Sequence, residues 1–262
     1  MLEPLARLGY ACKAFVYAIV GLLACMAAFE RGGRVTDTKG ALLVILSQPF
    51  GNTVLFVLAA GLCGYALWRL LDAIVDPDRH GTDFKGLTER IGNVVKFAVY
   101  GALGVEAFRL ARGLRASAGT DAKLRMWTAR LLDVPLGEWI VASAGLIIAA
   151  YGISEIVEAV KHRDDARMDL SSIPRDRRSV LLRICRFGVA ARAVIIVAAG
   201  LFLVRAAIQD DPGEAHGIRE SVLQLAAGAY GRWILGGIAL GLLAYAIDQA
   251  VHARYRQIRS PL

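Results

Sequence analysis

The sequence predicts an all-α integral membrane protein: six transmembrane helices form three tandem two-helix repeats, in a pseudo-threefold bundle with short amphipathic outer helices. Three observations lead to this prediction. Hydrophobic residues make up 56% of the 262 residues and the mean hydropathy is +0.49, which exceeds the usual values for soluble domains. The apolar residues gather in six segments. Two patterns of helix length each occur three times, and repeats of this kind define the architecture of a chain.

The first pattern opens each repeat as RLGYACKAFVYAIVG, RIGNVVKFAVYGALG and RFGVAARAVIIVAAG. Without gaps, the copies share an arginine, a glycine, a cation, a tyrosine that is Ile196 in the third copy, and a second glycine. These positions are Arg7, Arg90 and Arg186; Gly9, Gly92 and Gly188; Lys13, Lys96 and Arg192; Tyr17 and Tyr100; and Gly21, Gly104 and Gly200. After the arginine they recur every fourth residue, so each copy predicts one helix with one special face.

The second pattern follows each first helix, and it predicts the second helix of each repeat. Its copies share a glycine, then a tyrosine fourteen residues later, then an alanine. These are Gly51, Gly137 and Gly231; Tyr65, Tyr151 and Tyr245; and Ala73, Ala159 and Ala253. The chain is thus one membrane domain, 1–262, with repeat units at approximately 5–78, 88–165 and 183–257.

The six apolar segments reach spanning length only if charges near their ends can extend to the interface. Within the six segments, uncharged runs such as 14–29 and 52–68 are shorter than the roughly 18 apolar residues of a simple transmembrane helix. Allowing for snorkelling, the predicted spans are 8–29, 52–75, 91–111, 138–160, 187–208 and 232–253. The alternative is a soluble six-helix bundle, whose helices would be apolar almost all round, which is unusual for surface helices.

The net charge of +8 fits contact with lipid headgroups better than contact with nucleic acid, because the basic residues flank apolar segments. Eight lysines and arginines lie in the 161–186 loop alone. The sequence therefore predicts a membrane protein with both termini in the cytoplasm. Outer loops are expected at about 30–50, 112–137 and 209–231.

The first helix could be mistaken for a lipoprotein signal peptide, since Arg7 and Lys13 precede the run from Leu22 to Cys25. The same helix recurs at 90 and 186, where cleavage by a signal peptidase makes no sense. We therefore expect it to be retained.

A short amphipathic helix is expected after each first helix. The helix-capping pair Thr36-Asp37 precedes the first, and Thr120-Asp121 stands at the corresponding place in the second copy. Apolar faces follow at Leu124, Trp127, Thr128 and Leu131 in the second copy and at Ile218, Val222 and Leu225 in the third. Such helices lie in the bilayer interface or cover the mouth of a bundle. On the other side, the polar 161–186 loop is expected to be a solvated linker, and contact with anionic lipid is the alternative.

These patterns resemble the bacterial membrane proteins grouped as domain-of-unknown-function family 1206. The motif Arg-x-Gly-x3-Lys/Arg-x3-Tyr-x3-Gly opens each unit, and Pro-x-Gly followed by tyrosine marks the second helix. The resemblance covers nearly the whole chain. It implies six spans as three two-helix repeats in a bacterial cytoplasmic membrane, with no established activity, substrate or catalytic residue. The chain departs from the motifs at Ile196 and Ala229, so the third unit is the most diverged.

Charged residues within the spans are the strongest candidates for a functional site, because such residues are costly in a bilayer and often functional. The candidate network comprises Lys13, Lys96 and Arg192 on first helices, and Arg69, Asp72, Glu155, Glu158 and Asp248 on second helices. Lys13 is expected to face Asp72 and Lys96 to face Glu158, while Arg192 faces His252 with Asp248 one turn deeper. Glu106 could pair with Arg109. The repeated tyrosines and the glycines Gly21, Gly104 and Gly200 are expected to pack helices together.

Two functions remain open from the sequence. In the first, the protein is a structural or accessory membrane component whose charges pair within the bundle. In the second, Lys13, Lys96 and Arg192 line a vestibule, and the protein is a channel or transporter for a small anionic solute. No nucleophile with a base and no metal-ligand cluster is visible among the four cysteines and four histidines, so we expect neither an enzyme nor a cofactor.

Overall fold

The described part of the chain is α-helical and contains no strand. The computed structural model describes residues 2–29, 33–75, 84–117, 119–161, 174–228 and 230–255. Ala118 and most of the polar linker, 162–173, lie outside these residues. The elements are α1 (Leu2–Ala28), α2 (Thr38–Leu46), α3 (Gly51–Val75), α4 (Phe84–Ala111), α5 (Thr120–Leu132), α6 (Gly137–Val160), α7 (Arg175–Gln209), the 3-10 turn η2 (Pro212–Glu214), α8 (Ile218–Leu225) and α9 (Gly231–Tyr255).

Five of the described helices, rather than the predicted six, are long and apolar enough to cross a membrane. They are Ala6–Ala28 of α1, Gly51–Ile74 of α3, Gly137–Val160 of α6, Arg177–Gln209 of α7 and Gly231–Tyr255 of α9. The exception is α4, which contains the predicted span 91–111. Lys96, Glu106 and Arg109 are spread along α4, and such charges lower the hydropathy of a helix through its length. The prediction of six spans was therefore wrong at α4, which was expected to span the membrane at 91–111.

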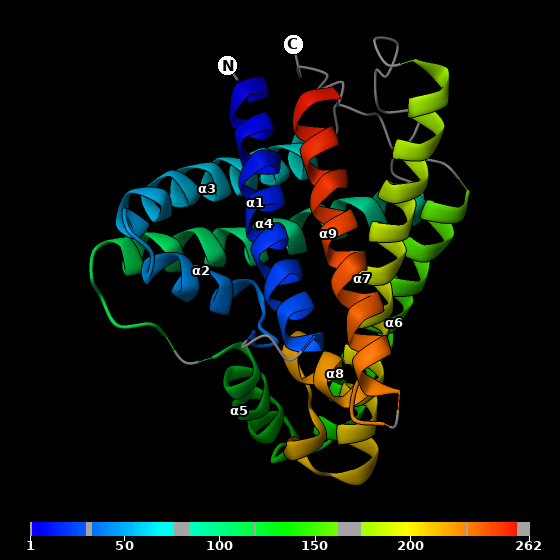
Figure 1. Ribbon diagram of the computed structural model, residues 1–262. Helices are drawn as coiled ribbons and strands as arrows, with labels where there is room; N and C mark the ends of the chain where they lie inside the picture. The colour runs from blue at the N-terminus through cyan, green and yellow to red at the C-terminus, as the bar shows by residue number, and fades with distance from the viewer. Residues whose placement is uncertain are drawn as a thin grey trace.

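The long helices pack as three close pairs, α1 with α9, α3 with α4, and α6 with α7. Each pair joins the first helix of one repeat to the second helix of another. Packing of α1 on α3 and of α7 on α9 connects the pairs, whereas packing of α4 on α6, which would close a ring, is nearly absent among the described residues. In Figure 1, α3 and α4 run across the other four long helices. The predicted pseudo-threefold arrangement is thus not confirmed.

The last shared glycine of each first helix lies where a close pair touches. A Cβ on Gly21 would come within 2.9 Å of Leu243 in α9, and one on Gly104 within 2.6 Å of the Cys63 sulfur in α3. Gly200 packs in the same way on α6, where a Cβ would lie 2.6 Å from the backbone of Ala149. Small residues permit such close helix approach. In all three copies, this glycine therefore contacts the second helix of another repeat.

The first shared glycine shows where the symmetry breaks. A Cβ on Gly9 would lie 2.3 Å from Tyr65, and one on Gly188 would lie 2.2 Å from the backbone of Tyr245. These are equivalent contacts, between the two helices of one repeat. Gly92 is the equivalent in α4, and no atom of another described element lies within 4 Å of its Cβ position. In the described part of the second unit, this glycine contact between its own two helices is therefore missing.

Each unit also has the short helix that the sequence predicts, namely α2, α5 or α8. In α2, the side chain of Asp37 accepts a hydrogen bond from the backbone N–H of Gly40 and caps the helix. A tight turn then leads into the second long helix. A Cβ on Gly51, Gly137 or Gly231 would lie 2.3, 1.6 or 1.8 Å from a carbonyl oxygen of the preceding short helix or of the residue that ends it. Only glycine fits there, which explains why the sequence repeats it.

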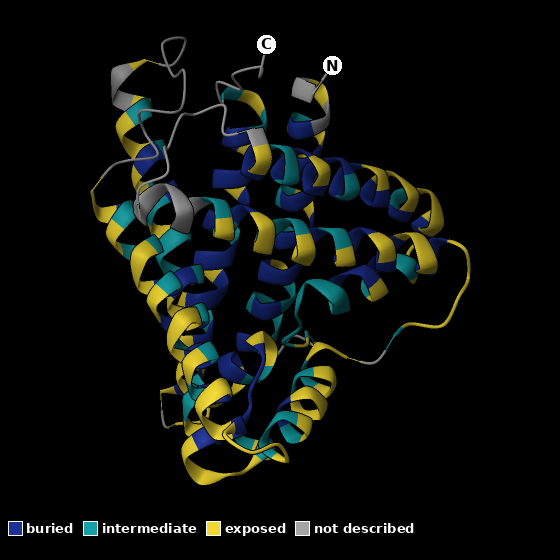
Figure 2. Cartoon of the chain, turned by 180° about the vertical axis from the view of Figure 1, so that it is seen from behind, coloured by how far each residue is buried: buried dark blue, intermediate teal, exposed yellow. Residues whose placement is uncertain are grey.

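The two ends of the bundle differ. In Figure 1, the start of α1 and the end of α9 lie at one end, and α5 and α8 lie at the opposite end. Figure 2 shows exposed residues along the outer faces of the long helices and buried residues between them. Large apolar side chains such as Leu146 and Ile147 of α6 are exposed, as expected for a surface that faces lipid.

We predict that the equivalent glycines tolerate alanine very differently. Gly9→Ala and Gly188→Ala should each lower the free energy of unfolding by about 1–3 kcal/mol, because the added methyl overpacks a helix contact. Gly92→Ala should be neutral or should stabilise by up to about 1 kcal/mol through helix propensity. Unfolding of the three variants in detergent measures this. Equal losses at all three positions would mean that α4 packs on α6 as the other units do.

Candidate functional site

The six long helices all contribute side chains to one region inside the bundle, which we call the central cluster. Two edge-on ring pairs organise it: Tyr65 with Tyr100 and Tyr17 with Tyr245, whose ring centroids are 5.0 and 4.7 Å apart. The members are Tyr10, Lys13, Tyr17, Tyr65, Arg69, Asp72, Asn93, Lys96, Tyr100, Tyr151, Glu155, Arg192 and Tyr245. Most of the predicted charge network therefore meets in one place.

Lys13 lies in the middle of the cluster, and only 5% of the residue is exposed. Its ammonium donates a hydrogen bond to the Tyr65 hydroxyl at 3.3 Å. It also lies 4.6 Å from the ring centroids of both Tyr65 and Tyr100, and 5.5 Å from that of Tyr10. The negative faces of aromatic rings attract a cation most strongly when water is excluded. Tyrosines thus surround Lys13, where the sequence had predicted Asp72.

Arg69 is the most extensively bonded cation of the cluster. Its guanidinium donates to the hydroxyls of Tyr65 and Tyr10, each at 2.9 Å, and to the side-chain oxygen of Asn93 at 3.1 Å. It pairs with Asp72 at 3.3 Å, and the Asn93 amide donates to the same carboxylate at 3.0 Å. The planar guanidinium suits several acceptors at once. Asp72 is therefore held by Arg69 of its own helix and by Asn93 of α4.

Arg192 forms the third part of the cluster. It pairs with Glu155 of α6 at 2.7 Å, donates to the Tyr17 hydroxyl at 3.3 Å and lies 5.1 Å from the Tyr245 ring centroid. The hydroxyl of Tyr151 donates to the same Glu155 carboxylate. One ion pair thereby connects α7 and α6, and tyrosines of α1 and α9 contact the same guanidinium.

Asp248 and His252, which the sequence had placed near Arg192, contact each other. The carboxylate, almost fully buried, accepts a hydrogen bond from Gln249 at 2.8 Å and lies 3.4 Å from the Nδ1 of His252. The ring of His252 stacks on Tyr10, with centroids 5.5 Å apart. Asp248 and His252 thus form their own pair beside the central cluster.

Lys96 and Glu158 are both half-buried. Lys96 lies within electrostatic range of Glu155, Arg69 and Lys13, which places it at the edge of the cluster. Its pairing with Glu158 stays a prediction. Of the predicted packing tyrosines, Tyr151 is half-buried, whereas Tyr17, Tyr100, Tyr65 and Tyr245 are buried.

Sequence reasoning missed two members of the cluster, Tyr10 and Asn93. They occupy the same position of the repeat, which is Val189 in the third copy, so no shared residue type singles them out in the alignment. Position does: Tyr10 precedes Lys13 by three residues and Asn93 precedes Lys96 by three, so each lies one turn from a repeated cation and on a neighbouring part of the helix surface. Polar side chains at that spacing on an apolar helix could have been included.

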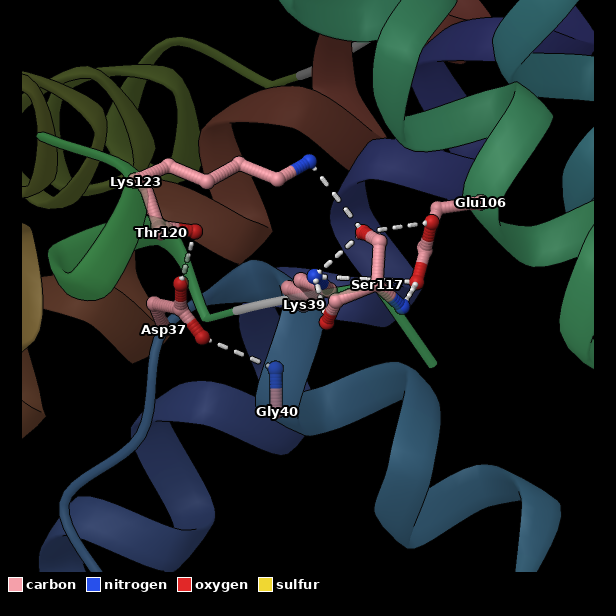
Figure 3. Close-up of polar contacts among 7 residues, drawn as sticks. All are labelled: Asp37, Lys39, Gly40, Glu106, Ser117, Thr120 and Lys123. Carbon is pink, nitrogen blue, oxygen red and sulfur yellow. Dashed lines mark hydrogen bonds and ion pairs between the residues drawn. The ribbon is translucent and has the colours of Figure 1, made fainter. Parts of the chain in front are cut away.

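A second polar network lies around the carboxylate of Glu106 (Figure 3). This carboxylate accepts hydrogen bonds from the backbone N–H of Ser117 at 2.7 Å and from its hydroxyl at 2.9 Å. Lys39 of α2 lies 3.6 Å from the carboxylate and donates to the Ser117 carbonyl at 2.6 Å. The ion pair in the structure is therefore with Lys39, whereas the sequence had suggested Arg109. It joins the first unit to the second.

Further contacts join the short helices. The Thr120 hydroxyl at the start of α5 donates to Asp37 at 2.7 Å. Arg125 of α5 pairs with Glu220 of α8 at 2.8 Å, and Arg219 lies 4.0 Å from Asp121. Burial, together with the nearby carboxylate of Glu220, raises the pKa of Asp121 above its ordinary value. The short helices of all three units, α2, α5 and α8, are thus connected through these contacts.

The chemistry of the central cluster is that of charge burial. In the described residues, no group of three or more histidine, cysteine, aspartate and glutamate side chains could hold a metal ion. The cluster instead consists of cations, phenol hydroxyls and carboxylates in mutual contact. Such groups can hold helices together, and they can also attract an anion if a path to water exists.

Comparison with known proteins gives a family and one curated relative. The family described as Domain of Unknown Function (DUF1206) matches residues 8–76, 91–162 and 187–256, three segments that fit the internal repeat. A Bacillus subtilis (strain 168) protein described as uncharacterized protein YxxB is 32% identical over 257 residues, which cover 98% of this chain and 92% of that one. No solved structure matches the chain significantly. The resemblance inferred from the repeated motifs is confirmed.

We predict strong energetic coupling between Arg192 and Glu155. Arg192→Met or Glu155→Met alone should cost up to about 3–5 kcal/mol of stability, because each leaves a largely buried charge without its partner. The double variant should cost clearly less than the sum. The matched control is the pair Arg205 and Glu214, 3.2 Å apart and more exposed, where coupling should be about 0.2–1 kcal/mol. Unfolding in detergent measures both cycles, and additive losses at Arg192 and Glu155 would contradict the pairing.

Proposed function

This chain belongs to the family described as Domain of Unknown Function (DUF1206), and from that membership and the central cluster we propose that it is a multi-pass structural or accessory protein of the bacterial inner membrane. The observation that carries the proposal is the Arg192–Glu155 ion pair, together with the enclosure of Lys13 by tyrosines. Cations that already have partners within the protein need no solute. The protein acts without catalysis and without a cofactor.

The channel or transporter for a small anion is the weaker alternative. It requires Lys13, Lys96 and Arg192 to line one aqueous path. The burial of Lys13 and the carboxylate partner of Arg192 speak against such a role for these two residues. Lys96, which is half-buried, is the cation most open to this reading.

We propose that the protein contacts the lipid bilayer and does not bind nucleic acid. Both termini are proposed to lie in the cytoplasm, because the 161–186 loop carries eight basic residues on the same side. The start of α1 and the end of α9 lie at one end of the structure, which supports a common side for the termini. The same loop is proposed to be a solvated linker, and contact with anionic lipid is the alternative.

The proposal predicts no anion flux. Purified protein reconstituted into vesicles loaded with chloride or phosphate should release these anions no faster than protein-free vesicles do. Release that exceeds this background, and that Lys13→Met or Lys96→Met abolishes, would contradict the structural role and establish the transport alternative. Release that both variants leave unchanged would show that the chain conducts by another path, which also contradicts the proposal.

The orientation is predicted to show in cysteine labelling. In a chain whose four native cysteines are replaced by alanine, Gly33→Cys and Ala118→Cys should react with an impermeant thiol reagent added to intact cells. Ser171→Cys should react only after the cells are opened. The reverse pattern would invert the orientation while leaving the fold unaffected.

A further inference from the structure

Three of the four tryptophans of this chain are exposed, and all three belong to the end of the bundle that carries α5 and α8. Trp127 lies in α5, Trp139 in the first turn of α6, and Trp233 in the first turn of α9; they are 56, 66 and 69% exposed. The starts of α6 and α9 lie at the same end as α5 in Figure 1. The fourth, Trp68, is buried and packs on Arg69. Large exposed aromatic side chains concentrated at one end are not expected of a surface in water.

Two turns at this end add apolar side chains that project outward. Leu136 precedes α6 and is 71% exposed, and Tyr230 precedes α9 and is 75% exposed. Leu136 has a φ of 67°, a left-handed conformation that glycine adopts easily and leucine does not. A large apolar side chain that is exposed from a strained backbone position indicates that this side chain makes a functional contact.

Cations accompany the exposed rings. The guanidinium of Arg130 lies 5.4 Å from the ring centroid of Trp127, and that of Arg232 lies 5.4 Å from that of Trp233. Each pair presents an apolar ring next to a positive charge. The headgroup region of a bilayer offers the matching combination, since phosphates lie there directly above the acyl chains.

We propose that the side chains of Trp127, Leu136, Trp139, Tyr230 and Trp233, here called the aromatic rim, form a lipid-binding surface in the headgroup region of the bilayer. Amphipathic rings prefer this region, with the ring among the upper acyl carbons and the polar edge toward water. Arg130 and Arg232 bind lipid phosphates. The rim thereby fixes the depth of α6 and α9 in the membrane. This inference rests on the proposed insertion of the bundle in a bilayer.

The first unit is excluded from the rim for a geometric reason. Its turn also exposes an apolar residue in a left-handed conformation, Phe50, with a φ of 62°. However, α3 runs across the other long helices, and its start lies away from α5 and α8 (Figure 1). The turn at Phe50 therefore resembles the turn at Leu136 but lies elsewhere in the bundle.

Tryptophan fluorescence tests the rim. Single-tryptophan chains, with the other three changed to phenylalanine, are reconstituted into vesicles of phosphatidylglycerol and phosphatidylcholine. The phosphatidylcholine carries bromine either near the headgroup or near the chain ends. Chains that retain only Trp139 or only Trp233 should lose most of their emission with shallow bromine and less with deep bromine. The chain that retains only Trp68 should change little with either. If Trp68→Phe prevents folding, Trp68 is kept and its emission, measured alone, is subtracted.

The outcomes separate this inference from the proposed function. The proposal is overturned if Trp139 and Trp233 are insensitive to brominated lipid but are quenched by aqueous acrylamide, because the rim would then face water and be free for a protein partner. Alkaline extraction of the same vesicles is the second measurement. If the chain stays in the membrane but the emission of its rim tryptophans is insensitive to bromine, only the proposal of the aromatic rim is contradicted. If the chain washes off, both proposals are contradicted.

Discussion

The structure depends on the burial of cations in a bundle of mostly apolar helices. A cation left alone within a span costs roughly 2.5–3.5 kcal/mol on insertion scales, which is more than a typical interhelical polar contact returns. Helices must therefore approach until each cation meets a partner. Around Lys13 the partners are rings from α1, α3 and α4, and around Arg192 they are a carboxylate of α6 and a hydroxyl of α1. The requirement to compensate charge thus selects which helices meet.

The shared residues on one face of each first helix have two roles, close helix packing and compensation of charge, and this requirement links them. On α1, Gly9 lets α3 approach to backbone contact, and Gly21 lets α9 do the same. Lys13 and Tyr17 lie between these glycines and reach the neighbours that the glycines admit. Larger residues at the glycine positions would move the helices apart and leave the cation without rings. Packing and charge compensation are therefore properties of the same face.

Much of the fold and the membership of the site could be predicted from sequence, because both follow from helix periodicity. The repeat predicted that the cation and the tyrosine of each first helix share a face, and Lys13, Tyr17, Tyr100 and Arg192 do meet in the central cluster. The choice of partners could not be predicted. Depth along two helices places Lys13 level with Asp72, but it cannot show that Arg69, one turn away on the same helix, reaches that carboxylate first. The crossing direction of α3 and α4 is likewise set by side-chain fit between helices, which hydropathy does not encode.

The three equivalent cations show why one repeat cannot stand for the others. Lys13 lies among aromatic rings, Arg192 lies against a carboxylate, and Lys96 is half-buried on α4. The differences follow from the packing: α1 and α7 each contact two long helices through their shared glycines. Among the described residues, α4 contacts one long helix in this way, through Gly104, because no atom lies within 4 Å of a Cβ on Gly92. The same side chain at the same repeat position thus has a different electrostatic environment in each unit. Any role of these cations therefore belongs to the asymmetric bundle as a whole, and not to the two-helix repeat from which it is built.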